Sequence, residues 1–266
     1  MASTAVLVGG AGRGAHPHAR RVAAIRLGLA ATVVALWEAA SASGLFYRDV
    51  IPSLLAIGRA LGTLAVSADF YGHLAVSLME IAQALAIGSG LGIAVGLALG
   101  GSRFLSRAFE PYLYYLGPTP KIVFFPVMIM WFGVGPASKV ALGALSCFFP
   151  VVLMVAAGMR QIDPVLIRVG RSFHASPLQM ALKVHLPAMR ASILNGVRLG
   201  LGVAVVVTVL AETKLSSAGI GYLIMRAYAV FDMPRLYAML IVLFALAIAA
   251  NELLGRYAGE SVSGRP

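Results

Sequence analysis

Four glutamates stand in or beside long apolar runs of this 266-residue chain, at positions Glu38, Glu80, Glu212 and Glu252. Carboxylates serve as general acids, general bases and ion ligands, and a carboxylate inside a hydrocarbon layer is costly enough to be a functional candidate by default. Glu38 and Glu252 lie near the ends of their runs, where hydration costs little. Glu80 and Glu212 are therefore the two acidic candidates for a pathway through the protein.

The surroundings of the two candidates differ. Glu80 has Ser77 and Gln83 within three residues, a spacing that predicts either a polar strip or an internal hydrogen-bond cluster. Glu212 stands at the mouth of an apolar run, beside a loop that contains glycine. We predict that both line a translocation pathway, together with Pro120 and Lys121.

Other catalytic constellations are missing from the sequence. His16 with His18, and His174 with His185, have no cysteine or carboxylate at ligand spacing, so no metal site is predicted. The chain has no GxSxG nucleophile elbow. None of its lysines follows a glycine, and a P-loop needs Gly-Lys to hold phosphates. We therefore expect no enzyme activity, no cofactor in this chain, and a partner for any ATP chemistry.

The elements that must position these residues follow from composition. Hydrophobic residues make up 60% of the chain and charged residues 12%, against about half and about a quarter in soluble proteins. This surplus predicts an all-α, polytopic membrane protein. The net charge of +11 would suggest nucleic acid binding in a soluble protein, but here it predicts basic loops on one side of a membrane. Cys147 is the single cysteine, which excludes an intrachain disulfide.

Six runs are long enough to cross a bilayer. They are Val22–Ala40, Leu74–Leu99, Pro111–Phe132, Val140–Gly158, Ile193–Ala211 and Leu236–Leu254. With the N-terminus inside, 13 lysines and arginines fall on the cytoplasmic side, 6 outside (Lys139 among them) and 2 within spans. This distribution predicts a multi-pass protein with both termini in the cytoplasm.

The remaining segments complete the predicted domain organisation. Residues 1–21 form a disordered cytoplasmic tail, residues 22–254 a single membrane domain, and residues 255–266 a second cytoplasmic tail. Between the first two spans, Leu54, Ile57, Leu61 and Leu64 fall on one helical face, which predicts a helix along the outer membrane surface.

Two spans carry packing signals. Gly88, Gly92, Gly96 and Gly100 recur every four residues and predict a groove into which a neighbouring helix packs closely. Pro118, Pro120 and Pro126 interrupt the third span, and broken backbone at membrane depth survives only against protein or a water-filled cavity. Lys121, beside this break, either faces a cavity or extends toward the membrane surface.

One basic, turn-rich segment interrupts the apolar pattern between the fourth and fifth spans. Within this loop, residues 159–192, Asp163-Pro164 and Ser176-Pro177 both predict an N-cap followed by proline at the first helical position. Pro187 is predicted to end the second helix. His174 is the expected turn residue, because histidine tolerates left-handed backbone better than most residues.

The first of these helices is amphipathic. Val165, Val169 and Phe173 share one face, whereas Arg168 and Arg171 lie elsewhere. Such an apolar ridge with a positive rim fits a groove on a partner protein. It equally fits an interfacial loop whose arginines contact lipid phosphates, and the physical pattern alone leaves both interpretations open.

The same loop resembles the cytoplasmic EAA loop of binding-protein-dependent ABC importer permeases, whose pattern is EAA, three residues, Gly, nine residues and then I-x-L-P. The matching positions are Arg168-Val169-Gly170, then His174, then Val184-His185-Leu186-Pro187. The spacing is intact, but Arg168 replaces the acidic residue and His174 replaces the glycine.

The resemblance extends over roughly residues 52–254. The stretches PTPKIVFFPVMIMWFGVGPASKV, FFPVVLMVAAGMRQIDP and VLAETKLSSAGIGYLI are similar to the nitrate, sulfonate and taurine branch of these permeases. At Glu80 that branch usually has an arginine. The resemblance implies a type I, MetI-like importer fold in a bacterial inner membrane and a small solute such as nitrate, a sulfonate, taurine or a pyrimidine-like compound.

The resemblance also implies partners and site residues. These are a second permease copy, an ATPase that holds ATP and Mg²⁺, and a soluble substrate-binding protein, within membrane lipid and without nucleic acid. The implied ATPase-coupling residues are Asp163, Val165, Arg168, Val169, Gly170, Arg171, Phe173, His174, Leu186 and Pro187. Two other functions stay open: an ion-driven secondary transporter, and a non-transporting permease paralogue.

Overall fold

A computed structural model describes residues 17–45 and 50–260, and within these ranges every regular element is helical. Five described helices have the length and apolarity to cross a membrane, and a sixth span results if one bent helix pair counts as a single crossing. The chain divides into two compact units, residues 1–56 and 57–266, which are described separately.

The first unit contains α1, Pro17–Ala42. The predicted disordered tail of residues 1–21 is wrong for its last five residues, because the helix already begins at Pro17, a residue suited to the first helical turn. Residues 1–16 lie outside the described residues. Glu38 accepts a hydrogen bond of 2.6 Å from the backbone N–H of Leu54. This glutamate therefore satisfies a free donor at the start of α2, Leu54–Ala65.

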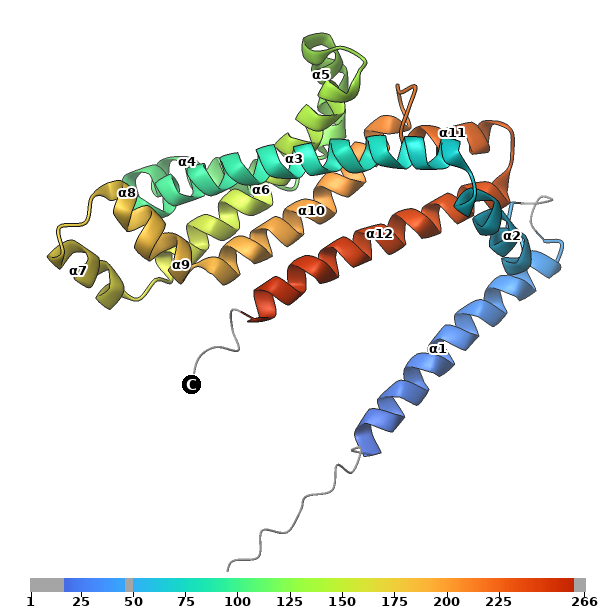
Figure 1. The fold of residues 1–266 in the computed structure, drawn as a ribbon, viewed down its shortest axis with the longest axis horizontal. Coiled ribbons are helices and arrows are strands. Elements are labelled where there is room, and N and C mark those ends of the chain that lie inside the picture. Colours follow the sequence, from blue (N-terminus) through green and yellow to red (C-terminus); the bar gives the residue numbers. More distant parts are fainter. Residues whose placement is uncertain (1–16, 46–49, 261–266) are drawn as a thin grey trace, which may run out of the picture. The chain divides into compact units, whose positions relative to one another are not determined.

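Three long helices form the centre of the second unit: α3, Ala68–Gly101; α6, Pro136–Arg160; and α10, Arg190–Glu212. Figure 1 shows α6 between α3 and α10, and α12, Met233–Glu260, packs against α10. The core between them is apolar, with Cys147, Val151 and Val155 of α6 fully buried. α12 continues through Glu260, so residues 255–260 of the predicted cytoplasmic tail extend the last helix, and residues 261–266 lie outside the described ranges.

The glycines of α3 form its contact with α6. A Cβ atom at Gly92 would lie 2.8 Å from Cβ of Val151, and a Cβ at Gly96 would lie 2.6 Å from Cβ of Val155. Gly88 and Gly100 face α6 in the same way. On the other side of α6, Gly196 and Gly200 of α10 approach Val151 and Cys147. Small residues therefore let three backbones pack at short range.

The third predicted span is two helices that meet at an angle of 91°. α4, Arg103–Leu116, is followed by a 3₁₀ turn, Lys121–Phe124, and by α5, Phe125–Phe132. The span starts earlier than the predicted Pro111, because Ser102 caps α4 by accepting a hydrogen bond from the N–H of Leu105.

Lys121 stabilises the break between α4 and the 3₁₀ turn. Its ammonium donates hydrogen bonds to the carbonyls of Gly117 and, at 2.9 Å, Leu116, which are free acceptors at the end of α4. It also lies 4.5 Å from the ring centroid of Phe149. Only 7% of Lys121 is exposed, so the expectation that it might extend to the membrane surface is wrong. Pro120, one residue earlier, is exposed.

Candidate functional site

The loop between α6 and α10, residues 161–189, begins with the first of its two helices. Asp163 caps α7, Pro164–Ser172, by accepting a hydrogen bond of 2.8 Å from the N–H of Val165. Phe173 is the C-cap of α7, and His174 follows with φ = +49°. Histidine therefore occupies the left-handed position for which glycine is ordinarily preferred.

The second helix of the loop starts at a capping box. Ser176 accepts a hydrogen bond from the N–H of Gln179, whose side-chain oxygen accepts one from the N–H of Ser176. The helical path runs through α8, Pro177–Met180, a π turn at Ala181–His185, and α9, Leu186–Ala188.

The prediction that Pro187 ends this helix is wrong. The helical path continues to Ala188 and breaks at Met189, where φ is −110° and ψ is 21°. In a regular α-helix the proline ring would collide with the carbonyl four residues earlier. The wider i→i+5 turn just before Pro187, in which the N–H of Leu186 bonds to the carbonyl of Ala181, accommodates the ring without ending the helix.

Gly170 joins the two helices of the loop. It is the buried residue of α7, and a Cβ there would lie 3.3 Å from Cγ2 of Val184 and closer still to the sulfur of Met180. The sequence signal for this contact was the glycine itself, which the helix propensity alone would not favour.

The outer surface of the loop is strongly apolar. Phe173 is 81% exposed, and Val165, Leu166 and Val169 are each about half exposed. A groove of about 650 Å³ opens between the helices. It is lined by Leu166, Val169, Gly170, Phe173, Ala175, Gln179, Lys183, Val184, Pro187 and Ala188. The sequence predicted a ridge, whereas the structure shows exposed apolar side chains around a hollow, with Arg168 and Arg171 exposed outside the groove lining.

His185 lies on the second helix of this loop and is partly buried. Burial, and then the nearby positive charge of Arg171, lower the pKa of His185 below its usual range. The loop therefore favours the neutral imidazole.

A second group of polar side chains lies about twenty residues along the helices from the loop. We call Ser77, Glu80, Lys139 and Glu212 the carboxylate cluster. Glu212 is 1% exposed and accepts hydrogen bonds of 2.6 Å from the hydroxyl of Ser77 and 2.7 Å from the N–H of Gly221. Ser77 in turn accepts one of 2.7 Å from the N–H of Ile220. Glu212 thus ties α3 and α10 to the start of α11, Ile220–Ala229.

Lys139 supplies the positive charge of the cluster. Its ammonium lies 3.8 Å from Oε1 of Glu80, and both side chains are 3% exposed. It also donates hydrogen bonds to the carbonyls of Val134 and Gly135. The Glu80 oxygens accept no hydrogen bond from the described residues. Because the cluster contains two carboxyl groups and one ammonium, its stability depends on that single cation.

Neither prediction for Glu80 holds as made. Gln83 is exposed while Ser77 and Glu80 are buried, so the three residues form no continuous polar strip. Ser77 and Glu80 lie in a buried cluster with Glu212, but the hydrogen bond of Ser77 goes to Glu212 and Glu80 accepts none there. Lys139, counted among the outer basic residues, lies in the first turn of α6 and is buried instead of standing in an exposed loop. Its role in the cluster was missed, since its neighbours in sequence, Ser138 and Val140, give no sign of a buried carboxylate partner.

The loop and the carboxylate cluster occupy opposite ends of the same helices. Lys139 begins α6 and the loop follows its last residue, Arg160, while Glu212 ends α10 and the loop precedes its first residue, Arg190. At 1.5 Å per residue the separation is about 30 Å, the thickness of a bilayer core. Among the described residues no group of three or more His, Cys, Asp or Glu is placed to hold a metal ion.

The membrane-length helices and the broken span are those of a multi-pass membrane protein. Residues 88–257 match the family described as the binding-protein-dependent transport system inner membrane component, and the chain belongs to this family. It is therefore an inner-membrane permease component of a binding-protein-dependent ABC importer, as the resemblance predicted.

Curated relatives match along most of the chain. SsuC of Bacillus subtilis (strain 168), which carries the name of an aliphatic sulfonates transport permease protein, is 34% identical over 214 residues, 80% of this chain and 78% of SsuC. TauC of Escherichia coli (strain K12), a taurine transport system permease protein, is 35% identical over 180 residues, 68% of this chain and 65% of TauC.

Solved structures confirm the fold. An inward-facing structure of the MetNI methionine ABC transporter aligns with a TM-score of 0.62 at 18% identity, covering 70% of this chain and 93% of that one. A crystal structure of an amino acid ABC transporter with histidines aligns with a TM-score of 0.54 at 17% identity, covering 75% of this chain and 95% of that one. The predicted all-α, MetI-like architecture is confirmed, with six spans when the bent pair is counted once.

Proposed function

We propose that this permease imports a small sulfonate, with taurine and the alkanesulfonates as the first candidates. The observation that carries the proposal is the similarity along most of the chain to SsuC and TauC, which are named for aliphatic sulfonates and taurine. The chain itself performs no chemistry. ATP and Mg²⁺ are held by a partner ATPase, and a soluble binding protein delivers the solute.

The α6–α10 loop is the element that couples the permease to the ATPase. Its exposed Val165, Val169 and Phe173 present apolar surface that a docked ATPase would bury, while Arg168 and Arg171 pair with acidic residues of that partner. The groove between the loop helices gives the contact a defined shape. Lipid contact alone would not need such a groove.

The assembly that this function requires is a pair of permease chains in the inner membrane, with both termini and the loop in the cytoplasm. Two copies surround the pathway, and two ATPase subunits bind the two loops. The carboxylate cluster then lies at the outer side. In this arrangement Glu80 and Glu212 act at the outer end of the pathway, whereas Pro120 and Lys121 shape its broken span.

The test is sulfonate uptake by proteoliposomes that contain the permease and its ATPase, with the binding protein added. Phe173→Asp places a charge in the apolar contact, so it should abolish uptake while the permease keeps its helical content and elution volume. Ser172→Asp, which adds the same charge one residue away and outside the groove lining, should leave most uptake intact. Phe173→Leu should retain coupling because it stays apolar.

Two results would contradict the proposal in different ways. Normal uptake by Phe173→Asp would remove the loop from coupling. Failure of the wild-type assembly to import any sulfonate, with ATP hydrolysis still stimulated by a loaded binding protein, would assign the permease to another solute.

A further inference from the structure

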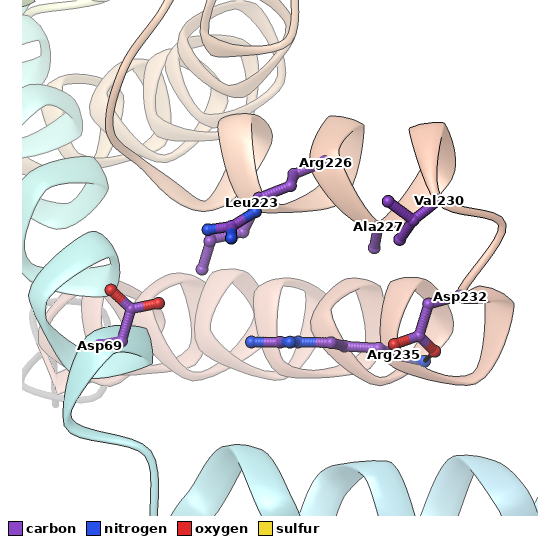
Figure 2. A pocket seen from close by; sticks show the side chains of 7 residues that line it. All are labelled: Asp69, Leu223, Arg226, Ala227, Val230, Asp232 and Arg235. Carbon is purple, nitrogen blue, oxygen red and sulfur yellow. Dashed lines mark hydrogen bonds between the residues drawn. The ribbon is translucent and has the colours of Figure 1, made fainter.

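A small charged pocket lies at the end of the second unit where α3 begins, beside α11 and the start of α12. Its volume is about 280 Å³. Figure 2 shows the side chains that line it: Asp69, Leu223, Arg226, Ala227, Val230, Asp232 and Arg235. Space of this size holds roughly nine water molecules at about 30 Å³ each, which suits a short-chain solute.

Two guanidinium groups form the positive pole of the pocket. Arg226 comes from α11 and Arg235 from α12, and in Figure 2 both side chains extend toward the same space. Neither guanidinium lies within ion-pair distance of a carboxylate among the residues that the structure describes. Asp232 is occupied locally, since its Oδ1 accepts a hydrogen bond of 3.2 Å from the backbone N–H of Arg235.

Asp69 forms the negative pole. It lies in the first turn of α3, and in Figure 2 its carboxylate faces the pocket from the side opposite α12's first turn. Nε2 of His73 lies 3.6 Å from Oδ1 of Asp69. Between the poles lie the apolar side chains of Leu223 and Ala227, both buried, and of Val230. The pocket therefore offers two cations, an apolar wall and two carboxylates, of which Asp232 caps the start of α12 and Asp69 lies apart from it on α3.

We propose that this pocket binds a short ω-aminoalkanesulfonate, with the sulfonate between Arg226 and Arg235 and the ammonium on Asp69. Guanidinium groups bind tetrahedral oxyanions through paired N–H donors, and a second arginine from another helix supplies donors on the other side. The short carbon chain then lies along Leu223 and Ala227. This proposal rests on the proposed sulfonate import, and it narrows the substrate to molecules that carry both charges.

The position of the pocket suits a site at which the permease first binds the solute. It lies at the end of α3 that carries the carboxylate cluster, which is the end away from the α6–α10 loop. His73, next to Asp69, accepts a hydrogen bond of 3.1 Å from the N–H of Gly219, in the segment that Glu212 ties down through Gly221. A solute on Asp69 is thus linked through His73 and Gly219 to the buried cluster.

Equilibrium binding of radiolabelled taurine to the purified full-length permease in lipid nanodiscs, without binding protein, tests the proposal. Saturable binding is expected, and unlabelled taurine should compete better than ethanesulfonate or ethylamine, each of which retains one of the two charged ends. Arg226→Gln or Arg235→Gln should weaken both taurine and ethanesulfonate by about ten-fold or more, because each variant loses charge-assisted hydrogen bonds to the sulfonate.

Asp69→Asn tests the ammonium contact separately from the sulfonate contact. It should weaken taurine about ten-fold and leave ethanesulfonate unchanged, so that the preference for the amine is lost. Arg59→Gln, an exposed arginine of α2 outside the pocket lining, is the matched control and should change neither affinity. If a glutamine variant elutes at a different volume or has less helical content than wild type, Arg→Lys at the same position replaces it. The lysine variant should weaken binding while the protein stays folded.

The outcomes separate this inference from the proposed function. Taurine binding that is equal in wild type, Arg226→Gln and Asp69→Asn would overturn the pocket assignment, even if the full assembly imports sulfonates. Taurine binding that appears only at concentrations typical of added salt, with no preference over ethylamine, would overturn the pocket assignment as well. Absence of sulfonate import by the wild-type assembly would instead overturn the proposed function.

Discussion

Glu212 organises one end of the helices by contacting residues of three other helices, α3, α6 and α11. Its two carboxyl oxygens accept from Ser77 of α3 and from Gly221 at the start of α11, while Glu80 and Lys139 lie beside it. A buried carboxylate with two hydrogen bonds and a nearby cation is a low-energy arrangement only as long as every member is present.

The members of the carboxylate cluster should contribute unequally to the free energy of unfolding. Lys139→Met removes the single cation and leaves two buried carboxyl groups, so it should lower the free energy of unfolding by about 3–5 kcal/mol. Glu80→Gln removes one of two acidic groups and should cost less. Equilibrium unfolding in mixed detergent–SDS micelles, followed by circular dichroism, measures both.

The double variant Lys139→Met/Glu80→Gln provides the control. Because the two residues interact directly, it should be more stable than the sum of the single losses implies. Strict additivity, or a Lys139→Met variant as stable as wild type, would show that the 3.8 Å pair contributes nothing.

The sequence predicted the two acidic members of this cluster but not their partner. Glu80 and Glu212 stood out because carboxylates in apolar runs are rare. Lys139 sits at the edge of a span, where lysine is ordinary, and only the packing of α6 against α3 turns it inward. The charged pocket was missed for the same reason, since Asp69, Arg226 and Arg235 are ordinary loop-edge residues until three helix ends meet.

At the scale of elements, the glycine row of α3 determines how closely α6 approaches. The four-residue spacing predicted this contact from sequence alone, because it places every glycine on one side of the helix. The partner helix was not predictable, since nothing in the spacing distinguishes α6 from the other spans.

Gly96→Ala and Gly90→Ala form a matched pair that tests this contact. A Cβ at position 96 would lie 2.6 Å from Cβ of Val155, so the variant should lose about 1–3 kcal/mol of stability through overpacking. A Cβ at position 90 has nothing within 4 Å, and alanine there should be neutral or slightly stabilising. Thermal unfolding of both proteins in one detergent gives the comparison, and equal melting temperatures would exclude close packing at Gly96.

The loop helices respond to pH through His185. Because burial and Arg171 lower its pKa, the unfolded loop binds a proton more readily than the folded loop does. The packing of α7 on the second helix should therefore be fully stable above about pH 6.5, the ordinary histidine value, and should weaken as pH falls through the lower folded value.

Hydrogen exchange of residues 166–173 between pH 8 and pH 5, corrected for the intrinsic rate, measures this change. His185→Gln should remove the extra opening at low pH while leaving the protein folded at pH 8. A protection pattern that is independent of pH in the wild type would contradict the assignment.

The π turn in the same loop could not be predicted from the sequence. Proline ordinarily ends or kinks a helix, so Pro187 predicted a boundary. The i→i+5 bond from Leu186 to Ala181 is a backbone adjustment that leaves no periodic signal in the side chains.

At the scale of the whole molecule, the positive-inside pattern predicts which end faces the cytoplasm, and the structure supplies positions that test it. Leu178 in the loop is 68% exposed, and Tyr228 near the end of α11 is 55% exposed. The native Cys147 is fully buried and gives no competing label.

Single cysteines at these two positions should therefore label differently in intact cells. A membrane-impermeant maleimide should react with Tyr228→Cys directly and with Leu178→Cys only after the cells are permeabilised. The reverse pattern would invert the proposed topology and place the carboxylate cluster and the charged pocket in the cytoplasm.

The close contact of α3 with α6 also has a mechanical consequence. Two helices held together at four glycines, each four residues from the next, bend much less than either helix alone, so they act as one lever between the loop and the carboxylate cluster. A tilt of about 5° imposed at one end of a rigid rod about 30 Å long moves the other end by about 2.6 Å. That distance is close to the length of a hydrogen bond, so a small push on the loop is enough to make or break the bonds of Glu212.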